Sequence, residues 1–268
     1  TKEEEIIMEN TKTVKALKKQ LVAAIAMVLV AAVALGSSTY AWFVTNNKVD
    51  ATTSTISAQS NAAFMTIENG LTGASLVDTT SVTTTVTTKP LYPATFGEET
   101  GATKGTFMTG YGTDLDNGAL KGDLTTIGTP ENAVAKEYAL KQDYNISSKG
   151  QNLADLKVEK VENAKDAAST SDLAKALRVL VTSDDGSAWV VYGLDTTGAA
   201  YEVKLSSDTS NSAEVVLGSV TAGADTAVHV YLYYEGKDAK VTTKNLQDGK
   251  LTATNAVTVY FTATADNK

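Results

Sequence analysis

The feature that most constrains the fold is a regular alternation of apolar and polar residues in "LTATNAVTVYFTATA", residues 251–265. One face collects Leu251, Ala253, Val257, Val259, Phe261, Ala263 and Ala265. The opposite face collects Thr252, Thr254, Thr258, Tyr260, Thr262 and Thr264. A period of two is that of a β-strand with one buried face. This segment is therefore predicted to be a half-buried strand, with Asn255 as the one polar residue on its apolar face.

The same alternation recurs along the chain between turn-forming clusters of Gly, Asp, Asn and Ser. In the segment 228–234, Val228, Val230, Leu232 and Tyr234 alternate with His229, Tyr231 and Tyr233. Further strands are predicted at 82–88, 138–146, 156–161, 179–182, 188–194, 201–205 and 214–217. Many short strands with polar turns are typical of a sandwich or jelly roll. We expect residues 61–268 to form a mainly β, jelly-roll-like antiparallel β-sandwich.

Two regions depart from this pattern. Apolar residues at helical spacing in "SDLAKALRVL" predict one short helix at about 172–177, which leads into a strand. The Thr- and Gly-rich tract at about 71–128 has few aliphatic residues and many turn signals. It is expected to form long loops with a few edge strands, or a decoration inserted into the core fold.

The N-terminal region indicates export. An apolar run from Leu21 to Leu35 follows a lysine-rich segment, and its length suits the hydrophobic core of a signal peptide better than a spanning helix. Thr39 and Ala41 supply the small residues that a signal peptidase requires, so cleavage is expected between Ala41 and Trp42. Residues 1–41 then form the signal peptide, within which residues 1–7 are an extension of uncertain origin. The alternative is an uncleaved membrane anchor with an aromatic belt at Tyr40, Trp42 and Phe43.

The composition excludes several classes of function. The chain has 23 basic and 31 acidic residues, and a formal net charge of −8 disfavours binding to nucleic acid or anionic lipid. Membrane contact is expected only through the uncleaved N-terminal segment. Without cysteine and with a single histidine, the chain cannot build the usual zinc sites or a cysteine nucleophile. We expect no cofactor, no metal and no enzymatic activity, with an exported hydrolase as the alternative.

Individual candidate residues have simple structural interpretations. His229 lies on the outward face of a predicted strand and is expected to be solvated. In "DLDNG", Asp114 and Asp116 resemble the opening of a calcium loop, but Thr125 stands where the closing carboxylate belongs. "SDDG" at 183–186 is predicted to be a turn. Tyr231, Tyr233 and Tyr260 form either an exposed aromatic stripe for binding or cross-strand pairs on a covered sheet face.

Two stretches resemble a known group of exported proteins. The junction "STYAWFVTNNKVDATTSTISA" resembles signal regions cut by the SipW-type signal peptidase, in which a small residue, Thr, an aromatic and Ala precede Phe and a polar residue. The matching positions here are Ser38, Thr39, Tyr40, Ala41, Phe43 and Asn46, and Ser37 and Ser38 replace a frequent pair of glycines. The ending "YLYYEGKDAKVTTKNL…LTATNAVTVYFTA" is similar to the final hairpin of the TasA and camelysin group. The resemblance covers about the first sixty and the last forty residues.

The resemblance implies a secreted biofilm-matrix or surface protein whose jelly-roll domain self-associates into fibres. The N-terminal segment of one subunit, here residues 42–60, would be added as a strand to the next subunit. Its apolar residues are Trp42, Phe43, Val44, Val49 and Ile56. A β-prone segment released by cleavage can complete an exposed sheet edge through main-chain hydrogen bonds. The alternative is a membrane-tethered surface domain that binds a glycan or a host protein. The peptidase activity described for camelysin is not implied, because the chain has no "HExxH".

Overall fold

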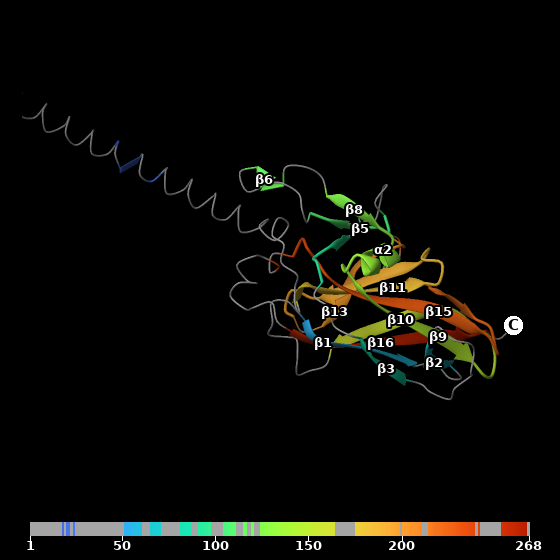
Figure 1. Ribbon diagram of the computed structural model, residues 1–268. Coiled ribbons are helices and arrows are strands. Elements are labelled where there is room, and N and C mark those ends of the chain that lie inside the picture. Colours follow the sequence, from blue (N-terminus) through green and yellow to red (C-terminus); the bar gives the residue numbers. More distant parts are fainter. Residues whose placement is uncertain are drawn as a thin grey trace, which may run out of the picture.

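The computed structural model (Figure 1) describes four helical residues near the N-terminus, Lys18, Gln20, Leu21 and Ala24, and a β-rich domain beyond residue 50. In that domain the described residues are 51–60, 65–70, 81–86, 91–97, 104–110, 115–116, 119–120, 124–163, 175–198, 200–208, 210, 214–238, 241 and 253–266. The rest of the predicted signal peptide and the cleavage residues Thr39, Ala41 and Trp42 lie outside this range. Phe43, Val44 and Val49 of the predicted assembly segment also lie outside it. Among the described residues, no helix is both long and apolar enough to cross a membrane.

The larger sheet has six strands in the order β13-β12-β11-β15-β9-β2. In chain order these strands are β2 (Met65–Asn69), β9 (Leu140–Ser148), β11 (Leu177–Ser183), β12 (Trp189–Leu194), β13 (Tyr201–Ser206) and β15 (Asp225–Tyr234). All of their pairings are antiparallel. Because β15 lies between β11 and β9, its side chains have neighbours on both sides.

The second sheet has five strands in the order β14-β10-β16-β1-β3. These are β1 (Ala51–Ser60), β3 (Ser81–Val86), β10 (Leu153–Asn163), β14 (Gly218–Val220) and β16 (Ala253–Ala265). The pairing of β1 with β16 is parallel, whereas the other pairings in this sheet are antiparallel. The first and last strands of the domain are therefore neighbours.

One apolar core lies between the two sheets. Ile56 of β1, Val230 of β15 and Val259 of β16 are fully buried in it. The hydroxyl of Tyr144 on β9 donates a hydrogen bond to the backbone oxygen of Ile56 at 2.9 Å. This bond crosses the core and connects the sheets, and a buried hydrogen bond of this kind stabilises a fold by about 1 kcal/mol.

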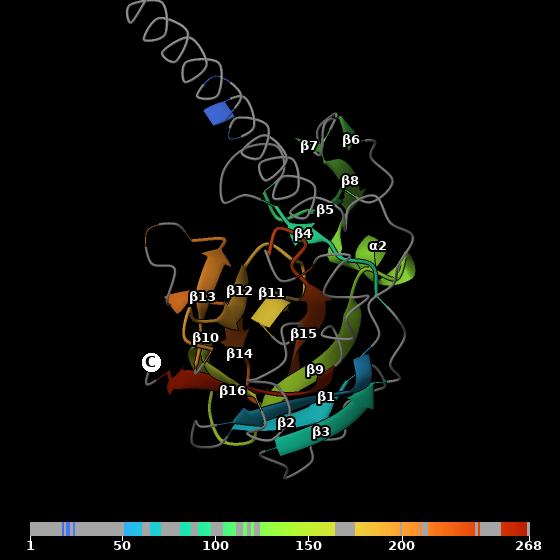
Figure 2. The ribbon, with the colours of Figure 1, turned by 90° about the vertical axis from the view of Figure 1, so that its left-hand side faces the viewer.

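A third layer covers the outer face of the six-stranded sheet, on the side opposite β16 and β1 (Figure 2). It consists of the sheet β4-β5-β8, with strands Thr95–Phe96, Phe107–Thr109 and Thr125–Gly128, and the helix α2 (Pro130–Ala135). Phe96 packs edge-to-face on Trp189, and Phe107 packs in the same way on Tyr233, each with ring centroids 4.9 Å apart. A separate hairpin pairs β6 (Leu115–Asp116) with β7 (Ala119–Leu120).

The mainly β, antiparallel character of the domain is confirmed, and most predicted strands coincide with observed ones within two or three residues at each end. The strand predicted at 214–217 is wrong, because β14 begins only at Gly218. Val215 and Leu217 are buried, and of this segment Leu217 N donates a hydrogen bond to Leu156 O of β10 at 2.7 Å.

The helix prediction needs correction. Of the helix predicted at 172–177, Lys175 and Ala176 are helical, but Leu177 already begins β11, and residues 172–174 lie outside the described range. The helix α2 was not predicted. In the tract 71–128 the described residues include β3, at an edge of the five-stranded sheet, and all three strands of the small sheet that covers the outer face.

Candidate functional site

The strongest candidate site is a row of polar side chains on the outer face of the six-stranded sheet. In the strand register, His229 of β15 stands opposite Thr182 of β11 on one side and opposite Asp143 of β9 on the other. Cross-strand partners project to the same face. The register of three neighbouring strands therefore places a hydroxyl, an imidazole and a carboxyl side by side.

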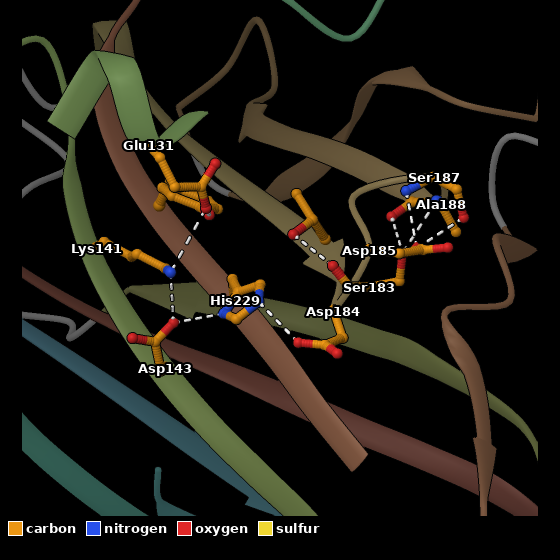
Figure 3. Close-up of polar contacts among 11 residues, drawn as sticks. Glu131, Lys141, Asp143, Ser183, Asp184, Asp185, Ser187, Ala188 and His229 are labelled. Atoms are coloured by element: carbon orange, nitrogen blue, oxygen red, sulfur yellow. Dashed lines mark hydrogen bonds and ion pairs between the residues drawn. The ribbon is translucent and has the colours of Figure 1, made fainter. Parts of the chain in front are cut away.

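Each ring nitrogen of His229 faces a carboxylate (Figure 3). Nδ1 is hydrogen-bonded to Asp143 Oδ1, and Nε2 lies 3.5 Å from Asp184 Oδ1. His229 is only 9% exposed. The two carboxylates differ in their surroundings, because the Asp143 side chain is 12% exposed and that of Asp184 is 76% exposed. The ring thus connects a buried acid to an exposed one.

Next to this row lies an ammonium between two carboxylates. Lys141 Nζ is 2.9 Å from Asp143 Oδ1 and 3.5 Å from Glu131 Oε1. The Tyr231 hydroxyl donates to Glu131 Oε1 at 2.5 Å. Burial by itself raises the pKa of Glu131. The hydrogen bond from Tyr231 and the nearby Lys141 ammonium outweigh burial, so the pKa of Glu131 lies below its ordinary value. Burial, followed by the Glu131 hydrogen bond, raises the pKa of Tyr231 well above its ordinary value.

The turn between β11 and β12 carries the exposed acid. Asp185 Oδ1 accepts hydrogen bonds from Ser183 Oγ at 2.7 Å and from Ser187 Oγ at 2.8 Å and N at 3.0 Å. These bonds, that from Ser183 first, lower the pKa of Asp185 to about 2. Asp185 therefore shapes the turn that places Asp184 beside His229. The sequence "SDDG" predicted the turn but not this contact.

The helix α2 forms another side of the site, and its sequence explains its position. Thr129 is the N-cap, with its hydroxyl accepting from Asn132 N at 3.4 Å, and Pro130 occupies the start of the first turn. Ala133 is fully buried against the outer face of the sheet. Glu131, in the first turn, is held beside Tyr231 and Lys141.

These elements enclose a pocket of about 230 Å³. Its lining includes Phe96, Gly105, Glu131, Asp184, Trp189, His229 and Tyr231. Gly105 has φ +70°, and a Cβ there would lie 3.2 Å from the indole Nε1 of Trp189. Glycine is favoured at this position for both reasons. The aromatic residues that line the pocket are buried, whereas the carboxylates of Asp184 and Glu131 are exposed.

The chemistry available here is acid–base chemistry. The Asp143–His229 hydrogen bond orients the imidazole so that Nε2 faces the pocket, the orientation that a general base requires. Nε2 faces the carboxylate of Asp184 at 3.5 Å, however, and among the described residues it makes no hydrogen bond to a serine or threonine hydroxyl. The described residues also contain no group of three His, Asp or Glu side chains that could hold a metal ion.

The structure corrects one interpretation of the sequence on this face and decides between two alternatives for another. His229 is not solvated, because the small sheet and α2 cover the outer face. Tyr231 and Tyr233 are 1% and 0% exposed, so they belong to the covered face and do not form an exposed stripe. Tyr260 lies on β16 in the other sheet. Sequence reasoning did not find Glu131, Lys141 or Asp143, although "TPEN" at 129–132 is a usual helix start.

The other predicted residues are distributed as follows. Ile56 is on β1 and is buried in the core of its own domain. Asp116 is on β6, and Asp114 lies outside the described residues. A comparison of the chain with protein-family models, with curated proteins and with solved structures found no match.

Proposed function

We propose that the chain is a secreted, non-enzymatic structural subunit or accessory protein of an extracellular matrix or surface fibre. In this proposal a signal peptidase removes residues 1–41, and the jelly-roll-like domain then self-associates by strand addition. The observation that carries the proposal is the position of β1. This strand directly follows the predicted processing region and lies between β16 and β3, with Ile56 in the core.

The pairing of β1 is of a kind that a second copy can supply. Its parallel pairing with β16 is not formed by a hairpin, so the sheet does not require the two strands to belong to one chain. The same groove between β16 and β3 can accept β1 of its own domain or β1 of a neighbour. Exchange of an identical element between subunits is domain swapping, and repeated in one direction it produces a filament.

The connection after β1 supports such an exchange. Only "NAAF", residues 61–64, separates the end of β1 from the start of β2, which belongs to the opposite sheet. Short hinges between elements favour exchange between subunits. In an exchanged arrangement, Tyr144 of one subunit would donate its hydrogen bond to Ile56 of the next.

The residues before β1 provide the test. Protein beginning at Trp42 is expected to form filaments that are visible by negative-stain microscopy. Protein beginning at Asp50 retains β1 and should remain a folded monomer without filaments. β1 makes the same contacts in its own domain as in a neighbour, so the apolar residues of Trp42–Val49 are what would favour the neighbour. A chain with Trp42–Val49 replaced by an equally long Gly-Ser segment controls for length and should behave like the truncated one.

Two outcomes would contradict the proposal. If all three proteins form filaments equally well, Trp42–Val49 has no role in assembly. Filaments formed by none of them, over a range of concentration and pH, would favour the second candidate. That candidate is a membrane-tethered surface domain that binds a ligand, and the pocket beside His229 is the observation that favours it.

A further inference from the structure

In its neutral form, His229 leaves two acceptors facing each other. Lys141 Nζ lies 2.9 Å from Asp143 Oδ1, and in this ion pair the carboxylate accepts hydrogen bonds and cannot donate them. Asp143 therefore holds the proton of a neutral imidazole on Nδ1. Nε2 then carries a lone pair, and it lies 3.5 Å from the carboxylate oxygen of Asp184. A single group with two N–H donors can donate a hydrogen bond to each of these two acceptors.

The neighbouring part of the cluster shows which donor fits. The ammonium of Lys141 already lies between two acceptors, Asp143 and Glu131, and 5.7 Å from the centre of the Tyr231 ring. An ammonium has three N–H donors and a charge that carboxylates and aromatic faces both attract. The pair formed by His229 Nε2 and Asp184 Oδ1 repeats this arrangement of acceptors at the pocket.

The pocket has the size and charge for such a group. Its volume of about 230 Å³ exceeds the roughly 150 Å³ that holds a benzene molecule in an engineered cavity. Asp184 and Glu131 are 76% and 58% exposed, so both are accessible at its opening. The exposed Asp184 side chain can also adjust its distance from the ring. The net charge of −8 adds a general attraction for cations.

We propose that this pocket binds a primary ammonium group, which donates one N–H to His229 Nε2 and another to Asp184 Oδ1. The ammonium belongs either to a free alkylamine or to a lysine side chain presented by a peptide. This inference does not depend on fibre assembly.

A proton competes with the ligand at the same place. Protonated imidazole donates from both nitrogens, so Nε2 then bonds Asp184 directly and no longer accepts from an ammonium. The titratable and charged groups that face the ring or its carboxylate partners are Lys141 and Asp143 on β9, Asp184 and Asp185 in the turn, Glu131 on α2 and Tyr231 on β15. Binding of the ammonium therefore requires the neutral ring.

The experiment uses the full chain, in which His229 is the only histidine and gives unique ring signals in NMR spectra. At pH 8 and constant ionic strength, 1,5-diaminopentane should shift these signals in a saturable manner. Tetramethylammonium has the charge but no N–H donor, and it should produce no saturable shift.

Two variants test the assignment of the acceptors. Asp184→Asn should weaken binding of the diamine by at least about tenfold, because a hydrogen bond to a charged group is lost. Asp195→Asn, in the turn at the opposite end of β12, should bind like the wild type. The tripeptide acetyl-Gly-Lys-Gly-amide, compared with acetyl-Gly-Gly-Gly-amide, separates a lysine side chain from a free amine as the source. The proposal is overturned if tetramethylammonium shifts the signals equally or if Asp184→Asn binds unchanged.

Discussion

The two faces of the six-stranded sheet are built from the same strands, but they differ in chemistry. On β15, Val228, Val230 and Leu232 point into the aliphatic core, whereas His229, Tyr231 and Tyr233 point to the outer face. Both sets are buried. The inner face is covered by a second sheet and holds almost only apolar groups. The outer face is covered by a small sheet and one helix and keeps polar groups that must find partners there. The sheet that covers the outer face is smaller than the sheet that covers the inner face, and it leaves room for the pocket.

The largest effect is expected on the inner face. Leu232 is 1% exposed, so Leu232→Ala should lower the free energy of unfolding by about 2–5 kcal/mol through lost burial and a new cavity. Urea-induced unfolding measures this. Val216→Ala removes apolar atoms from a side chain that is 46% exposed and should stay within about 0.5 kcal/mol of the wild type. Similar losses for both variants would contradict the role given to the core between the sheets.

A smaller effect distinguishes two tyrosines of the outer face. The Tyr231 hydroxyl donates to Glu131, whereas the Tyr233 hydroxyl makes no hydrogen bond of ordinary geometry with the described residues. Tyr231→Phe should lower Tm by about 2–4 °C, equivalent to about 1 kcal/mol. Tyr233→Phe should leave Tm unchanged or raise it, since no bond is lost. If Tyr233→Phe proves as harmful as Tyr231→Phe, the hydrogen bond to Glu131 is not what makes the Tyr231 hydroxyl stabilising.

The smallest effect concerns the turn at the opening of the pocket. The pKa of Asp185 is about 2, below the reference value of 3.8, so its stabilising contribution is present above pH 3.8 and is lost as the pH falls through about 2. The backbone N–H of Ser187 donates to this carboxylate at 3.0 Å. Its NMR signal should therefore titrate with a midpoint near pH 2. In Asp185→Asn this titration should be absent. A midpoint near pH 3.8 in the wild type would show that the hydrogen bonds of the turn do not stabilise the ionised carboxylate.

The alternation of residues predicted the strands well because a period of two directly reports which side chains share a face. For β15 and β16 it also predicted which face turns to the core. It could not show whether a further layer covers the opposite face, since that depends on residues distant in sequence. His229 was therefore expected in solvent, although Asp143 and the segment around Glu131 bury it.

The candidate site could be predicted only in parts. "SDDG" indicated the turn with Asp185 because the bend is local. The start of α2 was also visible in Thr129 and Pro130, although the prediction did not include it. The meeting of Lys141, Asp143 and His229 depends on the register between β9 and β15, which no local pattern specifies. Likewise, nothing in the sequence of β1 indicates its parallel pairing with β16.

That pairing has a consequence for biosynthesis. As the chain is made, β1 appears first among the strands, but its partner β16 follows only after roughly two hundred further residues. Such distant contacts slow folding, because the chain must lose much of its freedom before they form. The five-stranded sheet cannot be completed until the ribosome has added the last strand. Until then the newly made chain lacks its full core.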